Sequence, residues 1–170
     1  DISNGAPGNY ITIWGRNFGN ATGTVYFEVK DGGGQTSAAL APCVKSWNNN
    51  QIIAVVPTIA AGDYRVIVGR SNGSTQTLFS DGWPFLINAI QRPGLCSASP
   101  RSGLYPATTT LIGYGFPTTE PRDIIWLINN SNVTSTRETG WTATSVVDTA
   151  LEGSYRGRTS LRLYNGSVFS

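Results

Sequence analysis

Histidine is absent from the 170-residue sequence. Its absence excludes the commonest general base and metal ligand, together with every nucleophile that a neighbouring histidine would activate. Of the 10 acidic residues, none follows the spacing of a calcium loop or of a glycosidase carboxylate pair. We expect them to be ordinary solvated surface charges. The sequence therefore predicts no catalytic residue, no metal site and no cofactor.

Charge is also scarce. Charged residues make up 13% of the chain, and the 12 Lys and Arg are scattered among the 10 Asp and Glu. Proteins that bind nucleic acid usually gather basic side chains on one face, so we expect no nucleic-acid partner. No apolar run reaches the roughly 18 residues of a membrane span, which predicts no direct membrane insertion. A chain that begins at Asp1 and holds no methionine is expected to be a processed piece of a longer precursor.

The residues that are abundant indicate strands and turns. Gly, Ser, Thr, Asn and β-branched residues are frequent, which favours β structure over helix. Ile11 and Ile13 alternate with their neighbours, as do Val25 and Phe27, and this period of two is typical of strands with one buried face. Turns rich in Gly and Asn separate many such short segments. The pattern predicts an antiparallel β-sandwich.

The chain also contains an internal repeat. The segment GAPGNYITIWGRNF (5–18) aligns without a gap with GLYPATTTLIGYGF (103–116). Farther along, WNNNQIIAVVP (47–57) aligns with WTATSVVDTAL (141–151), and each repeat ends in a strand followed by Asn-Gly. Three matching blocks in the same order predict a duplicated domain.

These blocks resemble the IPT/TIG domains, the immunoglobulin-like domains of plexins and transcription factors. The first repeat carries ITIWGRNFG and SWNNNQIIAVVP, and the second carries SPRSGLYPATTTLIGYGF and GWTATSVV. The resemblance implies an all-β protein of two tandem immunoglobulin-like β-sandwiches, at residues 1–86 and 87–170. It is weak for function, because the family occurs in surface receptors, adhesion proteins, bacterial surface proteins, carbohydrate-active enzymes and some transcription factors.

Each predicted domain lacks one strand of the family pattern. The first begins without the opening strand that the second has in FLINAIQRPGLCSASP (85–100), and the second ends at VFS (168–170) without a closing strand. Proteins normally cover such open sheet edges. Two explanations follow: a longer chain supplies the strands, or a neighbouring copy donates them in head-to-tail fibres.

The two cysteines, Cys43 and Cys96, have no counterparts in the other repeat. In an oxidising compartment they would pair, closing a loop that the chain-entropy treatment values at about 4 kcal/mol. Alternatively, they are two buried free thiols. The sequence leaves both open, because it does not show whether their Cα atoms come within about 7 Å.

Five Asn-x-Ser/Thr sequons are candidate N-glycosylation sites on loops of a secreted protein. The sites at 129 and 132 are favoured, since Asn-Gly at 72 and 165 is itself a common hairpin turn. The five sites are Asn20, Asn72, Asn129, Asn132 and Asn165.

Two of the five tryptophans are equivalent in the repeats, and two others are candidate interface residues. Trp47 and Trp141 occupy equivalent positions of the repeats, which predicts a shared packing role. Trp83 and Trp126 have no such equivalence and are candidate interface residues, Trp126 within a run (DIIWLI) that is apolar on both strand faces. An exposed tryptophan or tyrosine is also able to stack on a sugar ring.

These features predict a non-catalytic module that is secreted or lies on a cell surface. Its role would be structural or adhesive, including that of a repeating subunit in a surface filament, and its partners would be copies of itself, other surface proteins or glycans. The alternative is a carbohydrate-binding accessory domain of a secreted glycoside hydrolase. A transcription-factor-type domain is a further rival, which the low and scattered charge disfavours.

Overall fold

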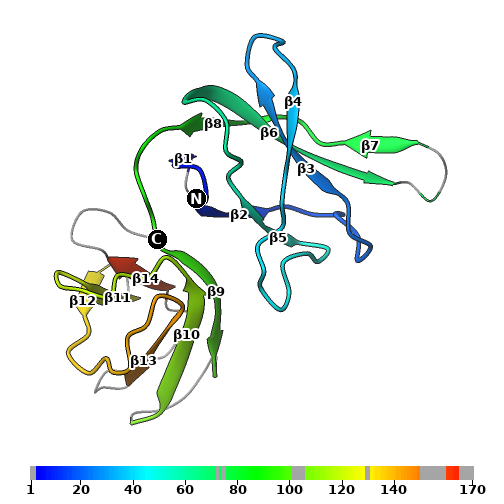
Figure 1. Ribbon diagram of the computed structural model, residues 1–170. Coiled ribbons are helices and arrows are strands. Elements are labelled where there is room, and N and C mark those ends of the chain that lie inside the picture. The colour runs from blue at the N-terminus through cyan, green and yellow to red at the C-terminus, as the bar shows by residue number, and fades with distance from the viewer. Residues whose placement is uncertain are drawn as a thin grey trace. The chain divides into compact units, whose positions relative to one another are not determined.

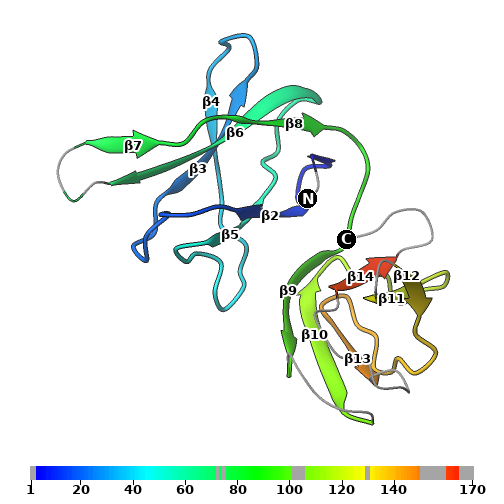
Figure 2. The same ribbon diagram turned by 180° about the vertical axis from the view of Figure 1, so that it is seen from behind.

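The computed structural model describes residues 3–71, 73, 76–100, 106–128, 131–149 and 160–164, and these contain strands, turns and loops but no helix. The predicted all-β, immunoglobulin-like class is confirmed. The chain divides into two compact units, Asp1–Gln91 and Arg92–Ser170, whose strands are labelled in Figures 1 and 2. The predicted border after residue 86 falls within β8 (Trp83–Ile87), the last strand of the first unit. That both units are domains of one family stays a prediction.

The first unit is built from two sheets. The large sheet has the order β1-β8-β6-β3-β4, with β7 paired to β6, and the small sheet pairs β2 with β5. All of these pairs are antiparallel except β1 with β8. The strands of the large sheet are β1 (Asn4–Gly5), β3 (Thr24–Val29), β4 (Gln35–Ala38), β6 (Gly62–Ser71), β7 (Thr77–Phe79) and β8, and those of the small sheet are β2 (Tyr10–Trp14) and β5 (Gln51–Val55).

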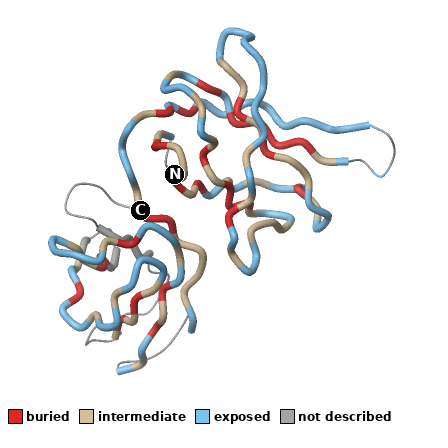
Figure 3. Tube along the Cα trace, in the orientation of Figure 1, coloured by how far each residue is buried: buried red, intermediate tan, exposed pale blue. Residues whose placement is uncertain are grey.

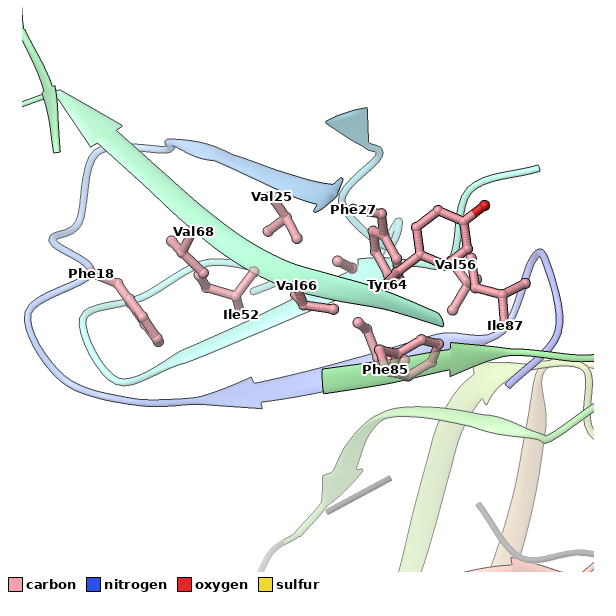
Figure 4. Packing of buried hydrophobic residues seen from close by; sticks show 12 residues of the cluster. Phe18, Val25, Phe27, Ile52, Val56, Tyr64, Val66, Val68, Phe85 and Ile87 are labelled. Carbon is pink, nitrogen blue, oxygen red and sulfur yellow. The ribbon is translucent and has the colours of Figure 1, made fainter. Parts of the chain in front are cut away.

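The two sheets of the first unit enclose one apolar core, shown from close by in Figure 4. Phe27, Val66 and Phe85 enter it from the large sheet, and Ile11 and Ile52 enter it from the small sheet. The rings of Phe27 and Phe85 meet edge to face, with their centroids 5.5 Å apart. Buried positions alternate with more exposed ones on β3 and β8 (Figure 3), so the period of two in these segments of the sequence reflects the inner and outer faces of the sandwich. The middle residues of β5 are all buried.

The second unit has two three-stranded sheets. Leu111 and Val146 of one sheet and Ile124 of the other belong to one buried cluster, which Phe116 joins from a loop. The first sheet has the order β13 (Ser145–Thr149), β10 (Thr108–Tyr114), β9 (Gly94–Ser99), and the second has the order β12 (Ser131–Thr134), β11 (Asp123–Ile128), β14 (Ser160–Tyr164).

A backbone loop follows β2 in the first unit and is held against the residues that precede β5. The Gly15 N–H donates to the Asn50 carbonyl (3.0 Å), and the Phe18 N–H donates to the Asn49 carbonyl (3.1 Å). Asn17, which directly precedes Phe18, has a φ of 63°, in the left-handed region that Asn tolerates better than most residues.

The second unit contains the same loop after β10. The Gly113 N–H donates to the Thr144 carbonyl (2.8 Å), and the Phe116 N–H donates to the Ala143 carbonyl (3.0 Å). Gly115, which aligns with Asn17, has a φ of 66°. The two aligned blocks of the sequence repeat therefore share the same backbone geometry.

Trp47 and Trp141 have the shared packing role that their alignment predicts. Each is half-buried and packs against the apolar cluster of its own unit. Trp47 Nε1–H also donates to the Gly19 carbonyl (3.2 Å), whereas the Arg122 guanidinium lies 5.1 Å from the centre of the Trp141 ring. The packing is repeated, but the polar contact differs.

The prediction that all acidic residues are solvated is wrong for Asp148. Its side chain is fully buried in β13. Its Oδ1 accepts hydrogen bonds from Ser135 Oγ–H (2.6 Å) and from the Thr149 N–H (2.8 Å). Burial of a carboxylate requires such donors, and no local pattern in the sequence indicates that Ser135 lies beside Asp148.

The aligned strands β2 and β10 differ in the number of strands that pair with them. In the second unit β10 lies between β13 and β9, whereas in the described part of the first unit β2 pairs with β5 alone. The short β1 pairs with β8 rather than with β2. The C-terminal segment 168–170, where the second domain was predicted to stop short of a closing strand, lies outside the described residues.

Candidate functional site

The outer face of the large sheet carries a pair of aromatic side chains. Tyr26 follows buried Val25 and precedes buried Phe27 in β3, so its side chain lies on the opposite face, away from the core. Tyr26 is paired across the strands with Ile67 of β6. Phe79 of β7 is paired with Gly69 of β6, two residues further along the same face.

The two rings lie over Gly69. Their centroids are 6.0 Å apart with an interplanar angle of 59°, and a Cβ added at Gly69 would lie 3.1 Å from a carbon of each ring. The absence of a side chain at Gly69 therefore allows both rings to approach the sheet. Phe79 remains 58% exposed, which leaves an apolar ring accessible on this face. We call Tyr26, Ile67 and Phe79 the outer aromatic face.

Polar side chains flank the outer aromatic face. Glu28 lies two residues after Tyr26, and Arg65 is paired with it on β6. Gln35 is paired with Glu28 from β4, and its Nε2–H donates to Glu28 Oε1 (3.0 Å). Rings beside hydrogen-bond donors and acceptors suit a ligand with apolar faces and polar edges, such as a sugar ring.

The groups on and beside this face can stack and form hydrogen bonds. Its side chains are aromatic, aliphatic, one carboxylate, one amide and one guanidinium, without a paired nucleophile and base. No group of three or more His, Cys, Asp or Glu that would hold a metal ion occurs among the residues that the structure describes. In the same residues, no helix is long and apolar enough to cross a membrane.

The structure describes the side chain of only one of the two tryptophans that are predicted interface residues. Trp83 lies at the start of β8 and is 69% exposed. Trp126 lies on β11, and its side chain is outside the described part of the chain. The interface role of both stays a prediction.

The two cysteines lie in separate units. Cys43 is half-buried in the loop between β4 and β5. Cys96 is half-buried in β9 at an irregularity, where Ser97 and Leu95 pair with the consecutive residues Ile112 and Gly113. Such a bulge re-aims the side chain of the extra residue. The pairing of Cys43 with Cys96 stays a prediction.

Of the five sequons, Asn20 is exposed in the loop between β2 and β3, an accessible position for a glycan. Asn72, Asn129 and Asn165 are outside the described residues, and so is the side chain of Asn132 on β12. N-glycosylation at all five positions remains a prediction.

The outer aromatic face was not predicted from the sequence. The alternation in β3 does place Tyr26 opposite to Phe27, and that signal was available. The partner ring was harder to find, because Phe79 belongs to a strand of three residues whose pairing with β6 is not evident from any local pattern. A cross-strand site of this kind depends on register, which composition does not fix.

Comparison with known proteins identifies part of the chain. The IPT/TIG domain family matches residues 1–83, so this part of the chain is similar to an IPT/TIG domain. This agrees with the resemblance noted in the sequence for the first repeat. A second such domain, at 87–170, is a proposal that rests on the repeated loop geometry.

Curated relatives of the chain include cyclomaltodextrin glucanotransferases. The chain is 42% identical to the enzyme of Bacillus licheniformis over 77 residues, which are 45% of this chain and 10% of that protein. It is 43% identical to the enzyme of Paenibacillus macerans over 75 residues, 44% of this chain and 10% of the relative. The match thus spans about a tenth of the length of these relatives.

Similar solved structures are more distant. One is the Bacteroides ovatus mixed-linkage glucan utilization locus SGBP-B in complex with a mixed-linkage heptasaccharide, at 17% identity and a TM-score of 0.35. The alignment covers 98% of this chain and 38% of that one.

Proposed function

We propose that the chain is a non-catalytic accessory module of a secreted carbohydrate-active enzyme and that it binds α-glucan chains on the outer aromatic face. The observation that carries the proposal is the 42% identity over 77 residues to a cyclomaltodextrin glucanotransferase. The match to an IPT/TIG domain over residues 1–83 supports a non-catalytic role. This is the role that the sequence analysis placed second.

The chemistry of the outer aromatic face supports the ligand class. The apolar face of a glucose unit stacks on an exposed ring, and Phe79 offers one. The sugar hydroxyls would exchange hydrogen bonds with Glu28, Gln35 and Arg65 at its side. The binding free energy from stacking on one partly exposed pair of rings is small, so we expect dissociation constants in the range of about 0.1 to 1 mM.

Affinity electrophoresis tests the proposal. The chain is run through native gels that contain soluble starch, and its migration is compared with that in gels without polysaccharide. We expect starch to retard the wild type and Phe79→Ala to lose most of the retardation. Leu78→Ala is the matched control, because Leu78 is the exposed neighbour of Phe79 on the opposite face of β7. Equal migration of the wild type with and without starch would refute glucan binding.

A structural or adhesive role is the second candidate. The observation that favours it is the edge of β2, which has no strand beside it within the described residues. Under this role the chain would act through strand pairing, and starch would leave its migration unchanged.

A further inference from the structure

The outer face of the small sheet carries an exposed tryptophan. In β2, Ile11 and Ile13 pack on the core side of the strand, so Thr12 and Trp14 lie on the opposite face. Trp14 is 63% exposed. A single exposed apolar residue needs no explanation by itself, so the groups around Trp14 decide what it can bind.

The exposure of Trp14 does not depend on which strands lie beside β2. Trp14 aligns with Ile112 of β10 in the repeat, and β10 has a paired strand on each side. Ile112 is nonetheless 46% exposed. A neighbouring strand occupies the edge of a sheet and leaves its outer face open, so we expect the Trp14 ring to stay accessible whatever pairs with β2.

A side-chain amide lies beside the Trp14 ring. Trp14 is paired with Gln51 of β5. The Gly15 N–H and the Asn9 carbonyl bond toward β5, so Trp14 and Gln51 form a non-hydrogen-bonded pair, in which side chains approach each other more closely. Within the part of the chain that the structure describes, the Gln51 side-chain amide has no hydrogen-bond partner. Its donor and acceptor groups are therefore available to a ligand.

The backbone around this pair is held from both strands. The Gly15 N–H donates to the Asn50 carbonyl (3.0 Å), and Asn50 Nδ2–H donates to the Gly15 carbonyl (3.4 Å). The Gln51 N–H donates to Asn48 Oδ1 (3.0 Å). A site on paired strands that are held in this way loses little conformational freedom when a ligand binds.

We propose that Thr12, Trp14 and Gln51 form a second α-glucan site, which we call the Trp14 surface. A glucose unit stacks on the indole ring, and its hydroxyls exchange hydrogen bonds with the Gln51 amide and the Thr12 hydroxyl. The ligand class rests on the proposed function. The site itself shares no residue with the outer aromatic face.

The two sites lie on opposite outer faces of one sandwich. The core shown in Figure 4 separates them, and packed sheets are about 10 Å apart, so one short oligosaccharide does not reach both sites. The chain would bind two glucan chains, or two distant segments of one polysaccharide, and link them as a divalent module. The Trp14 surface has one ring where the outer aromatic face has two, so we expect it to be the weaker site.

NMR titration of the isotope-labelled 170-residue chain with maltoheptaose distinguishes the two sites. We expect one group of shifts at Thr12, the Trp14 indole N–H and Gln51, and another group at the outer aromatic face. Trp14→Ile should abolish the shifts of Thr12 and Gln51 and leave the other group unchanged. Ile is the aligned residue of β10 and suits a strand, so this variant should fold.

Gln51→Leu tests the amide separately. It removes the hydrogen-bonding groups but little volume. Because a neutral hydrogen bond contributes modestly to binding, we expect the dissociation constant of the Trp14 surface to rise about 2- to 10-fold.

Trp83→Ile is the matched control. Trp83 is 69% exposed, but it is paired with buried Val66, which offers no hydrogen bond to a sugar. This variant should keep both groups of shifts.

The outcomes separate this site from the proposed function. Shifts at the outer aromatic face alone would overturn the Trp14 surface and leave the proposed function intact. Shifts of Thr12 and Gln51 that persist in Trp14→Ile would overturn it as well. Shifts at the Trp14 surface alone would support it and contradict the outer aromatic face, whereas a spectrum that maltoheptaose leaves unchanged would contradict both sites.

Discussion

Gly15 and Phe18 explain a motif that the sequence shows twice. A Cβ at Gly15 would overlap the end of the Phe18 ring, and the ring is buried in the core of the first unit. In the second unit Gly113 and Phe116 have the same relation, with a carbon of the Phe116 ring 2.6 Å from the Cβ position. The phenylalanine three residues later thus leaves no room for a side chain at either glycine, and at Gly113 the Gly94 carbonyl oxygen lies closer still to the Cβ position.

We expect Gly15→Ala to lower the free energy of unfolding of the first unit by about 1 to 3 kcal/mol, because the Phe18 ring must leave its position in a packed core. Urea unfolding of the wild type and the variant measures this. The cost should shrink when Phe18 is already Leu, since the smaller side chain leaves room for the methyl group. Strictly additive costs in the double variant would contradict the explanation.

At the scale of the element, the turn before β5 is repeated before β13. The Asn48 side-chain oxygen accepts the N–H groups of Asn50 (2.9 Å) and Gln51 (3.0 Å). In the second unit the Thr142 hydroxyl accepts the equivalent N–H groups at 3.2 and 2.9 Å. Different side chains at aligned positions thus close the same turn, and the turn holds the loop after the preceding strand of the repeat.

Asn48→Ala should destabilise the first unit by about 1 kcal/mol, because two backbone N–H groups lose their acceptor. Asn48→Thr should retain most of the stability, since Thr142 fills the same role in the second unit. Thermal unfolding of both variants tests this. An equal loss of stability in Asn48→Ala and Asn48→Thr would show that the side-chain oxygen at position 48 does not stabilise the turn.

The sequence was sufficient for the elements but not for the contacts between distant ones. The alternation of Val25 and Phe27 predicted their inner face, and the aligned tryptophans predicted their packing, because both signals are local or repeated. The buried Asp148 and the ring of Phe79 were missed. Each depends on a partner from another segment, Ser135 or Tyr26, that only the folded chain brings near.

At the scale of the whole molecule, the chain consists of two units. A disulfide between Cys43 and Cys96 is proposed. Neither cysteine is a free thiol in the structure, which supports the predicted pairing of Cys43 with Cys96. A bond between residues of different units would restrict their separation in the unfolded chain, where cross-linking has its main effect.

The intact mass under non-reducing conditions should be lower than that of the reduced chain by two hydrogen atoms, and proteolysis should yield one linked peptide pair. Reduction should lower the free energy of unfolding by up to about 4 kcal/mol. Alkylation of both thiols in the native, unreduced protein would contradict the pairing.

The central claim is that the chain acts through the outer aromatic face and that this face binds α-glucan. NMR titration of the isotope-labelled chain with maltoheptaose tests it most directly. We predict shifts that saturate with ligand and are largest for the amides of Tyr26, Ile67 and Phe79. A spectrum that does not change with maltoheptaose, or shifts confined to other strands, would contradict the account.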